Sequence, residues 1–359
     1  MKDAKISMKK ITVLIIEDSA FMRRELTKII NSDRDLWVIG AAGNGTEGLE
    51  MAKVLKPDVV TLDINLPDMD GITCLQHIMI ETPRPCIMIS AYTGKDSVES
   101  FEALELGAVD FVEKPSGEIS RDINRRARDI ISKIKEAVYV NLAVMTRQEA
   151  VPLALRKEAV SSSAEKVLRK IVVIGVSTGG PRTLMQIIPF LPADLNAPVL
   201  LIQHMPKKFT PGFAERLNNY SRLMVREAQN GEPLRENLVY VAPGDTNLFL
   251  MRNHDNVFIS LARPTKNDLI VPSVGKALNS AVDIFGKQVI GVILTGMGDD
   301  GANAMERLNT LGGVTIAESE ESAVIYGMPK EIIERSAARV IAPAGQIADR
   351  IVKAVRRGI

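Results

Sequence analysis

The stretch Ile-Thr-Val-Leu-Ile-Ile-Glu-Asp, residues 11–18, decides the fold of the first half of the chain, because a short apolar run stops abruptly at two carboxylates. Further apolar runs follow, and segments with the 3.6-residue period of helices separate them. The runs span residues 36–39, 59–62, 86–89 and 108–112, and the clearest helical segments span residues 21–30 and 97–106. Strands that alternate with helices need crossover connections, so we expect a five-stranded parallel sheet with helices on both faces.

Polar residues stand where the expected strands end. Glu17 and Asp18 end the first strand, Asp63 the third and Ser90 the fourth, and Lys114 follows the fifth. Parallel strands present ligand sites at their carboxyl ends, so these side chains should meet at one rim. A lone acidic residue there is usually a turn or a helix cap, but a match at every position argues for a site. Gathered carboxylates repel one another and favour a divalent cation, with Mg²⁺ the best candidate.

Composition limits the class of protein. The 359 residues are 46% hydrophobic and only 4% aromatic, which fits two soluble domains of ordinary size. A net charge of +1 gives no overall basic field for nucleic acid or an anionic membrane. Cys74 and Cys86 lie beside apolar residues, as buried thiols do in a reducing compartment, so we expect a cytoplasmic protein. The apolar run at residues 11–16 is too short for a signal peptide or a membrane span.

Three motifs of the first half resemble a known family. They read VLIIEDS at residues 13–19, LDINLPDMDG at residues 62–71 and FVEKP at residues 111–115, and they resemble a response-regulator receiver domain over residues 8–138. The resemblance implies a flavodoxin-like fold in which Asp63 accepts a phosphoryl group from a histidine kinase. Such chemistry is sensible, since a carboxylate can attack phosphorus while Mg²⁺ and a lysine offset the developing charge.

The same resemblance implies roles for neighbouring positions. It assigns Mg²⁺ to Glu17, Asp18, Asp63 and the Asn65 carbonyl, the phosphoryl oxygens to Ser90 and Lys114, and the aromatic switch to Phe111. Glu17 departs from the family, which often has aspartate there. Its extra methylene favours ligation through a water molecule.

The end of the first domain is less distinct. Residues 119–138 have helical period and a basic face, which is typical of a solvated helix. Residues 139–168 have no clear period and include three consecutive serines, so we expect a linker there, between a domain at 8–138 and another at 169–359. The linker also holds apolar residues, Val144 among them. Packing against a domain and lying free on the surface therefore both stay open.

The second half opens with an apolar strand at residues 171–174, a glycine-rich turn from Gly175 to Gly180 and an apolar-periodic helix at residues 184–188. This arrangement would expose Ser177 on a tight turn, and N–H groups at the helix start could hold negative charge on a tetrahedral oxygen. The pattern suits a nucleophilic serine. Taken alone, its commoner meaning is a serine that caps a helix after a nucleotide-binding-like turn.

A serine nucleophile needs a base, and the chain has only three histidines. His77 belongs to a predicted helix and His254 to a polar hairpin turn, so both have structural explanations. His204 differs, because it directly follows the strand at residues 199–202, at the sheet edge that displays a site. His204 is therefore the predicted base.

The acid of a triad should follow the strand at residues 289–293, where Asp299 and Asp300 stand. Spacing alone does not separate the two, and either could instead cap a helix that starts near Ala302. The order serine, histidine, acid differs from that of α/β-hydrolases, which disfavours a lipase-like fold. We expect a doubly wound, mostly parallel α/β domain with an antiparallel hairpin.

Five motifs of the second half closely resemble the chemotaxis protein-glutamate methylesterase family, also written CheB. They read IGVSTGG at 174–180, IQHMP at 202–206, VAPGD at 241–245, GVILTGMG at 291–298 with DG at 300–301, and YGMP at 326–329. With the receiver in front, the resemblance covers nearly the whole chain.

That resemblance implies Asp300 as the triad acid and places Thr178 and Met297 in the site, with oxyanion donors among the backbone N–H groups near them. Asn247 and Gly275 are departures, since relatives often carry histidine and aspartate at these positions. The departures bear on substrate-side or structural details, not on the triad.

The implied function is a phosphorylation-activated serine hydrolase of sensory adaptation. It would demethylate glutamate methyl esters on methyl-accepting chemotaxis receptors, and deamidation of receptor glutamines is a second expected activity because glutamine presents the same carbonyl. The resemblance implies Mg²⁺ in the receiver and no cofactor for the hydrolysis.

We expect the unphosphorylated receiver to cover the Ser177 site, and phosphorylation of Asp63, read through Ser90 and Phe111, to loosen that interface. A receiver that only recruits the enzyme to its kinase is the alternative. The sequence offers neither the helix-turn-helix nor the basic patch of a DNA-binding output domain. A non-catalytic binding module that uses the Gly175–Gly180 turn also stays open, although it leaves His204 and the aspartate pair unexplained.

Overall fold

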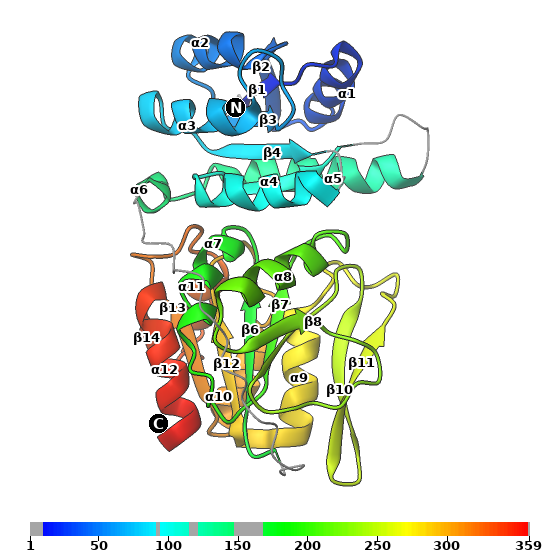
Figure 1. Cartoon of the computed structure of the whole chain (residues 1–359), viewed down its shortest axis with the longest axis vertical. Coiled ribbons are helices and arrows are strands. Elements are labelled where there is room, and N and C mark those ends of the chain that lie inside the picture. The colour runs from blue at the N-terminus through cyan, green and yellow to red at the C-terminus, as the bar shows by residue number, and fades with distance from the viewer. Residues whose placement is uncertain (1–9, 91–93, 115–120, 147–167, 358–359) are drawn as a thin grey trace, which may run out of the picture. The chain divides into compact units, whose positions relative to one another are not determined.

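The computed structural model describes residues 10–90, 94–114, 121–146 and 168–357. The chain divides into two compact units, Met1–Arg147 and Gln148–Ile359. Each unit has its own parallel sheet and its own buried apolar residues. Figure 1 shows each sheet with the helices that pack along it.

The first unit confirms the predicted five-stranded parallel sheet. Its strand order is β2-β1-β3-β4-β5, and every pairing is parallel. The strands are β1 (Ile11–Ile16), β2 (Leu36–Ala42), β3 (Val59–Asp63), β4 (Cys86–Ser90) and β5 (Asp110–Glu113). The helices are α1 (Ala20–Asn31), α2 (Gly45–Leu55), α3 (Gly71–Glu81), α4 (Gly94–Glu105) and α5 (Arg121–Ala137). Helix α1 packs with α5, and α3 packs with both α2 and α4, as two helical layers on one sheet require.

Short polar side chains begin three of these helices. Ser19, Asn44 and Asp70 are the N-caps of α1, α2 and α3, and each side-chain oxygen accepts a backbone N–H three residues further on. Strand β5 begins at Asp110, two residues later than the apolar run predicts. The reason is local, because the Ala108 N–H bonds the Ala103 carbonyl and so closes the end of α4.

The segment that we expected as a linker begins with a short helix, α6 (Leu142–Met145). The side chains of Val144 and Met145 are buried, and the helix belongs to the first unit. This part of the segment therefore packs against a domain. The rest of it, residues 147–167, lies outside the described residues.

The second unit confirms a doubly wound parallel sheet with a separate antiparallel hairpin. Its seven strands have the order β14-β13-β12-β6-β7-β9-β8, and all pairings are parallel. The strands are β6 (Ile171–Val176), β7 (Val199–Gln203), β8 (Met224–Glu227), β9 (Leu238–Val241), β12 (Val289–Ile293), β13 (Val314–Glu318) and β14 (Val340–Ala342). The hairpin pairs β10 (Asn247–Asn253) with β11 (Asn256–Ala262).

The α-helices of this unit are α7 (Gly180–Met185), α8 (Thr210–Tyr220), α9 (Val274–Phe285), α10 (Ala302–Thr310), α11 (Met328–Glu334) and α12 (Ala344–Arg357). Two short 3₁₀ helices, η1 (Ile188–Phe190) and η2 (Gly286–Gln288), join them. The expectation of one helix at residues 184–188 is wrong. Proline favours a first helical turn and breaks a helix interior, so Pro181 starts α7 earlier and Pro189 sits instead in η1.

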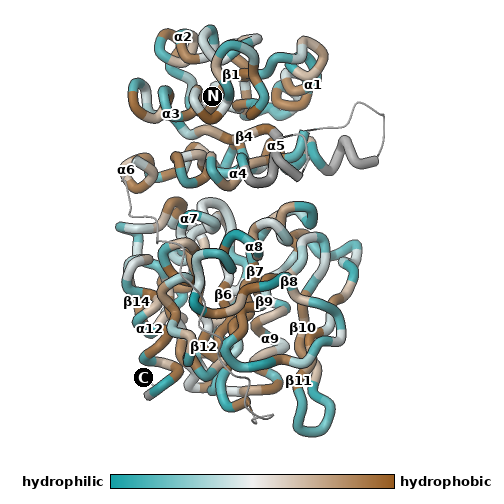
Figure 2. The backbone as a smooth tube through the Cα atoms, viewed as in Figure 1, coloured by the Kyte–Doolittle hydropathy of each residue, from teal (hydrophilic) through white to brown (hydrophobic). Residues whose placement is uncertain are grey.

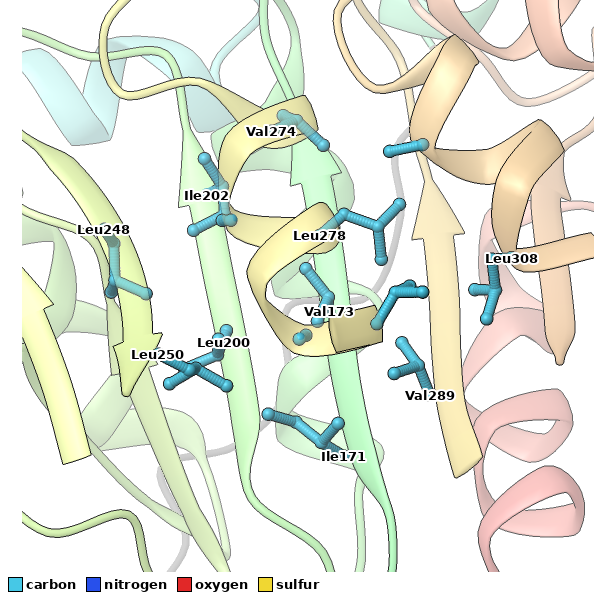
Figure 3. Packing of buried hydrophobic residues seen from close by; sticks show 14 of the residues in the cluster. Ile171, Val173, Leu200, Ile202, Leu248, Leu250, Val274, Leu278, Val289 and Leu308 are labelled. Carbon is cyan, nitrogen blue, oxygen red and sulfur yellow. The ribbon is translucent and has the colours of Figure 1, made fainter. Parts of the chain in front are cut away.

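Helix α9 lies over the central strands and brings its first turn to their carboxyl ends. Figure 3 shows Val274, the first residue of α9, near the arrowheads of the central strands, and Leu278 further along the same helix. Leu248 of β10 belongs to the same buried cluster. In Figure 2 the central strands are mostly brown, the colour of hydrophobic residues. A continuous apolar core thus supports the carboxyl ends of these strands.

Candidate active site and phosphoacceptor site

Ser177 directly follows β6, at the carboxyl edge of the sheet. Its N–H donates to the Thr295 carbonyl at 3.0 Å, and its own carbonyl accepts the Gly180 N–H at 2.9 Å, which closes a tight turn. Gly179 in that turn has φ +80°, and a Cβ there would lie 2.5 Å from Cβ of Val324. Only glycine tolerates both conditions, so the turn has the tight backbone that its sequence predicts. The expected exposure of Ser177 is wrong, because this residue is only 6% exposed.

His204 is fastened to the same edge. Its N–H donates to the Val176 carbonyl at 3.1 Å. The buried amide of Gln203 donates to the carbonyls of Ser177, at 2.9 Å, and of His204, at 3.1 Å. Gln203 thus ties together the backbones that carry the predicted nucleophile and the predicted base. Sequence reasoning missed this role, and its only signal was the position of Gln203 beside the histidine.

Asp300 receives the His204 ring. The distance from His204 Nε2 to Asp300 Oδ2 is 3.0 Å, and both side chains are largely buried. The first turn of α9 supplies three further donors to this carboxylate: Ser273 Oγ at 3.0 Å, Val274 N at 2.7 Å and Gly275 N at 3.0 Å. A helix N-terminus of this kind stabilises negative charge.

The electrostatics of Asp300 follow from these contacts. Burial raises the pKa of this carboxyl, but the hydrogen bond and charge of His204, with the N–H groups of Gly275 and Val274, outweigh burial and leave the pKa below its usual range. Asp299 differs, because its side chain is 67% exposed and lies 3.5 Å from Arg335 Nη2. Asp300 is thus the aspartate that faces His204.

Thr178 and Met297 lie on neighbouring loops of this edge. Thr178 is buried, and its carbonyl accepts the Thr295 hydroxyl at 2.9 Å. Met297 is partly exposed and follows Gly296, where a Cβ would lie 2.6 Å from Cβ of Ser177. The loop after β12 therefore approaches the serine closely.

One expected contact is absent. Among the described residues, the Ser177 hydroxyl forms no hydrogen bond with His204, whereas the bond from His204 to Asp300 is formed. Catalytic hydrogen bonds often tighten only when substrate binds, so the absence of this hydrogen bond is compatible with Ser177 as the nucleophile and His204 as its base. The contact to Asp300 uses Nε2, which leaves Nδ1 of His204 as the nitrogen that can take a proton.

The other histidines have structural surroundings, as predicted. His77 lies on α3, and its Nδ1 is 2.7 Å from a carboxylate oxygen of Glu81 on the same helix. His254 stands in the turn of the β10–β11 hairpin with φ +52°.

The polar residues of the first unit gather at its own sheet edge. Carboxylate oxygens of Glu17, Asp18 and Asp63 lie within 4.8 Å of one another. Lys114 Nζ donates to Asp63 Oδ2 at 2.7 Å and to Glu17 Oε1 at 3.1 Å. A cluster of hard oxygen donors beside a lysine is typical of a Mg²⁺ site, and the donor set fits that ion.

Burial and charge perturb this cluster. Burial raises the pKa of Glu17 to about 7, the charge of Asp63 adds to the rise, and Lys114 opposes it. Burial likewise raises the pKa of Asp63, against the opposing contacts with Lys114. For Lys114, burial lowers the pKa, but its two carboxylate partners raise it above its usual value.

The remaining receiver positions are placed as follows. Asn65 lies two residues beyond the end of β3, and its N–H donates to Asp63 Oδ1 at 3.3 Å. Phe111 is buried, and its ring meets that of Phe101 edge to face, with the centroids 5.8 Å apart. Ser90 ends β4, but its side chain lies outside the described residues.

No helix in the described ranges has both the length and the apolar character that crossing a bilayer requires.

The chain is similar to known proteins along both units. A family model described as CheB methylesterase matches residues 172–351, and one described as response regulator receiver domain matches residues 13–123. A protein-glutamate methylesterase/protein-glutamine glutaminase of Carboxydothermus hydrogenoformans is 49% identical over 361 residues, covering 97% of this chain and 100% of the relative. The corresponding protein of Thermotoga maritima is 42% identical over 346 residues, covering 96% of this chain and 98% of the relative.

A solved structure supports the fold of the second unit. The crystal structure of the Thermotoga maritima CheB methylesterase catalytic domain matches with a TM-score of 0.50 and 43% identity, and the match covers 51% of this chain and 97% of that domain. The strand-edge geometry, the family models and the full-length relatives agree. The chain belongs to the CheB family, as a protein-glutamate methylesterase/protein-glutamine glutaminase with a response regulator receiver domain.

Proposed function

We propose that Ser177, His204 and Asp300 are the catalytic triad that hydrolyses glutamate methyl esters on methyl-accepting chemotaxis receptors. The observation that carries this assignment is the 3.0 Å contact between His204 Nε2 and Asp300, at the sheet edge where Ser177 stands on its tight turn. A base held by a carboxylate at the same sheet edge as a serine on a tight turn is the arrangement that nucleophilic acyl transfer needs.

The reaction proceeds in two halves. His204 Nδ1 takes the proton of Ser177 Oγ, which attacks the ester carbonyl, and backbone N–H groups near Thr178 and Met297 stabilise the tetrahedral oxyanion. The imidazolium returns the proton to the leaving methoxide, so methanol departs and an acyl-enzyme remains. Water, deprotonated by His204, then releases glutamate. Asp300 keeps its charge and stabilises the imidazolium throughout.

Deamidation follows the same course. A glutamine side chain presents the same carbonyl, and the proton from His204 then goes to a leaving ammonia instead of methanol. The groups that act are side chains and backbone of this chain, and the hydrolysis uses no cofactor.

The receiver supplies the control. A histidine kinase of the chemotaxis system phosphorylates Asp63. Mg²⁺ would be held by Glu17, Asp18, Asp63 and the Asn65 carbonyl, and it would offset charge on the transferred phosphoryl group. Ser90 and Lys114 contact the phosphoryl oxygens, and Phe111 is the aromatic switch residue. Residues 8–138 form the receiver, 139–168 the linker and 169–359 the catalytic domain of a cytoplasmic enzyme that neither binds nucleic acid nor inserts into membranes.

Methanol release from methylated receptor fragments tests the triad. We expect turnover by the wild-type chain, with severe loss in Ser177→Ala and His204→Ala. His254→Ala is a matched control, since His254 is exposed in the hairpin turn and should leave turnover unchanged. Undiminished release by either triad variant would refute the assignment. Labelling of Ser177 by a serine-directed probe separates the esterase from a non-catalytic binding module, which should not react.

A further inference from the structure

A buried polar chain joins the hairpin to the triad acid. Asn247, the first residue of β10, is 1% exposed, and its Nδ2 donates to Asp268 Oδ2 at 3.1 Å. Its Oδ1 accepts the backbone N–H of Ser273 at 3.0 Å. Asp268 is itself held by the Thr265 N–H at 2.8 Å and by an ion pair with Lys276. Both ends of the Asn247 amide are thus engaged, which fixes its orientation.

Ser273 links the fixed Asn247 amide to the active site. It is the N-cap of α9, since its hydroxyl accepts the Lys276 N–H at 3.3 Å. The same hydroxyl donates to Asp300 Oδ1 at 3.0 Å. A cap that is displaced moves the first turn of the helix, and the Val274 and Gly275 N–H groups that hold Asp300 belong to that turn.

Gly275 contacts Asp300 through its backbone. A Cβ at Gly275 would lie 3.3 Å from Asp300 Oδ1, so the carboxylate approaches the bare backbone closely. With no side chain at this position, Asp300 depends on the placement of the helix turn. That placement depends in turn on Ser273.

We propose that Asn247 is a positioning residue that orients Asp300 toward His204 by holding Ser273 and the first turn of α9. The proposal rests on the proposed triad. Asn247 forms no hydrogen bond with His204 or Ser177 among the described residues; its hydrogen bonds lead to Asp268 and to Ser273 at the start of α9. Removing its amide leaves the partly buried Ser273 N–H and the Asp268 carboxylate each without one partner, and a shift of the turn then reaches the Asp300 carboxylate.

The first test compares two asparagines of one strand. Asn247→Ala should lower kcat about tenfold with KM nearly unchanged, because small misplacements of catalytic groups cost rate. Asn253→Ala at the exposed far end of β10 should change neither. In full-length protein labelled with ¹⁵N-histidine, the His204 Nε2–H signal, sheltered by Asp300, should broaden or shift in Asn247→Ala only. A folded Asn247→Ala protein with wild-type kcat and an unchanged His204 signal would overturn the proposal.

A reversed pair provides a second test. Asn247→Asp places two carboxylates together and should lose more activity than Asn247→Ala. Adding Asp268→Asn restores one donor and one acceptor across the pair, so the double variant should regain part of kcat and of the His204 signal. Recovery should be incomplete, because the Thr265 N–H shares the same Asp268 oxygen. A double variant no better than Asn247→Asp alone refutes the coupling.

Wild-type and Ser177→Ala proteins separate the two hypotheses. Equal methanol release by these two proteins means that the triad itself is wrong. Loss of release in Ser177→Ala, with Asn247→Ala as active as wild type, means that the triad stands and the positioning role fails.

Discussion

At the scale of single residues, Asp300 is the most heavily bonded member of the proposed triad. It accepts the His204 ring and three donors from the first turn of α9. Asp300→Asn keeps the shape but turns an NH₂ group toward one or more of these donors. We expect kcat for methanol release to fall by about 10⁴-fold, the loss that the same amide replacement causes in a serine-protease triad.

Asp299→Asn is the matched control for that variant. Its side chain is largely exposed and faces Arg335, so kcat should stay within about twofold of wild type, as for surface substitutions away from a site. If the two variants lost activity equally, the aspartate that completes the triad would be misassigned.

Glu17 gives a prediction about pH. Burial and the charge of Asp63 raise its pKa to about 7, so the carboxyl is largely protonated at pH 6 and largely charged at pH 8. A protonated carboxyl is a poor ligand for Mg²⁺, and binding must release its proton. The affinity for Mg²⁺ should therefore rise as the pH rises through 7. Glu17→Gln should bind more weakly and lose most of this pH dependence.

Calorimetric titration with Mg²⁺ at pH 6 and pH 8 measures the effect. Repeating each titration in two buffers with different ionisation enthalpies counts the protons released. The same affinity at both pH values, with no proton released, would show that Glu17 is already charged at pH 6.

The sequence predicts the reactive residues better than the residues that hold them. His204 emerges because the chain has only three histidines and the other two have structural explanations. Asp299 and Asp300 are adjacent, so spacing does not separate them; the family resemblance implies Asp300, and the direction of each side chain agrees with it. The roles of Gln203, Ser273 and Asn247 do not follow from the sequence, because they depend on contacts between segments far apart in the chain.

At the scale of elements, the loop after β12 tests how closely backbone approaches the nucleophile. A Cβ at Gly296 would lie 2.6 Å from Cβ of Ser177 and 2.6 Å from Sδ of Met328. Gly298, in the same loop, also has positive φ but open space around it. Gly298→Ala should cost about 1 kcal/mol of backbone strain, and Gly296→Ala about 2 kcal/mol more from overpacking.

Urea unfolding and methanol release test this pair. Gly296→Ala should also lower kcat at least about tenfold, because relief of the clash moves Ser177. Gly298→Ala should lose far less. Equal losses of stability and activity in the two variants would mean that the position of Ser177 does not depend on close packing against this loop.

Helices and strands are predictable where the burial of their residues gives a simple pattern of hydropathy. Strands such as β1 and β12 match their apolar runs residue for residue, because parallel strands are buried on both faces. Element ends are less predictable. A proline makes α7 begin at an earlier residue than its apolar pattern predicts, and a backbone hydrogen bond at Ala108 makes β5 begin at a later one. Neither effect shows in hydropathy.

At the scale of the whole molecule, two separate sheets and cores divide the labour of one enzyme. The proposed phosphoacceptor cluster lies entirely in the first unit and the proposed triad entirely in the second. Phosphorylation therefore controls hydrolysis only if the free energies of the two units are coupled, through an interface or the linker.

Removal of the receiver tests the form of that coupling. A chain of residues 139–359 should fold, since the catalytic domain of the Thermotoga maritima relative was solved by itself. If the unphosphorylated receiver covers the Ser177 site, deletion should raise basal methanol release about tenfold, within the usual range of coupling between sites. A small-molecule phosphodonor should raise release by the full chain, leave the shortened chain unchanged, and fail with Asp63→Ala.

The two remaining outcomes discriminate between mechanisms. If deletion leaves basal activity unchanged while the phosphodonor still activates the full chain, the receiver acts positively when phosphorylated, without occlusion. If neither deletion nor phosphodonor changes the rate, the receiver serves only to bring the enzyme to its kinase, because recruitment alters concentration at the receptor and not kcat. Rates are compared at one limiting concentration of a soluble methylated receptor fragment, because a covered active site lowers the fraction of enzyme that can bind substrate. An increase on deletion is then release of a covered active site.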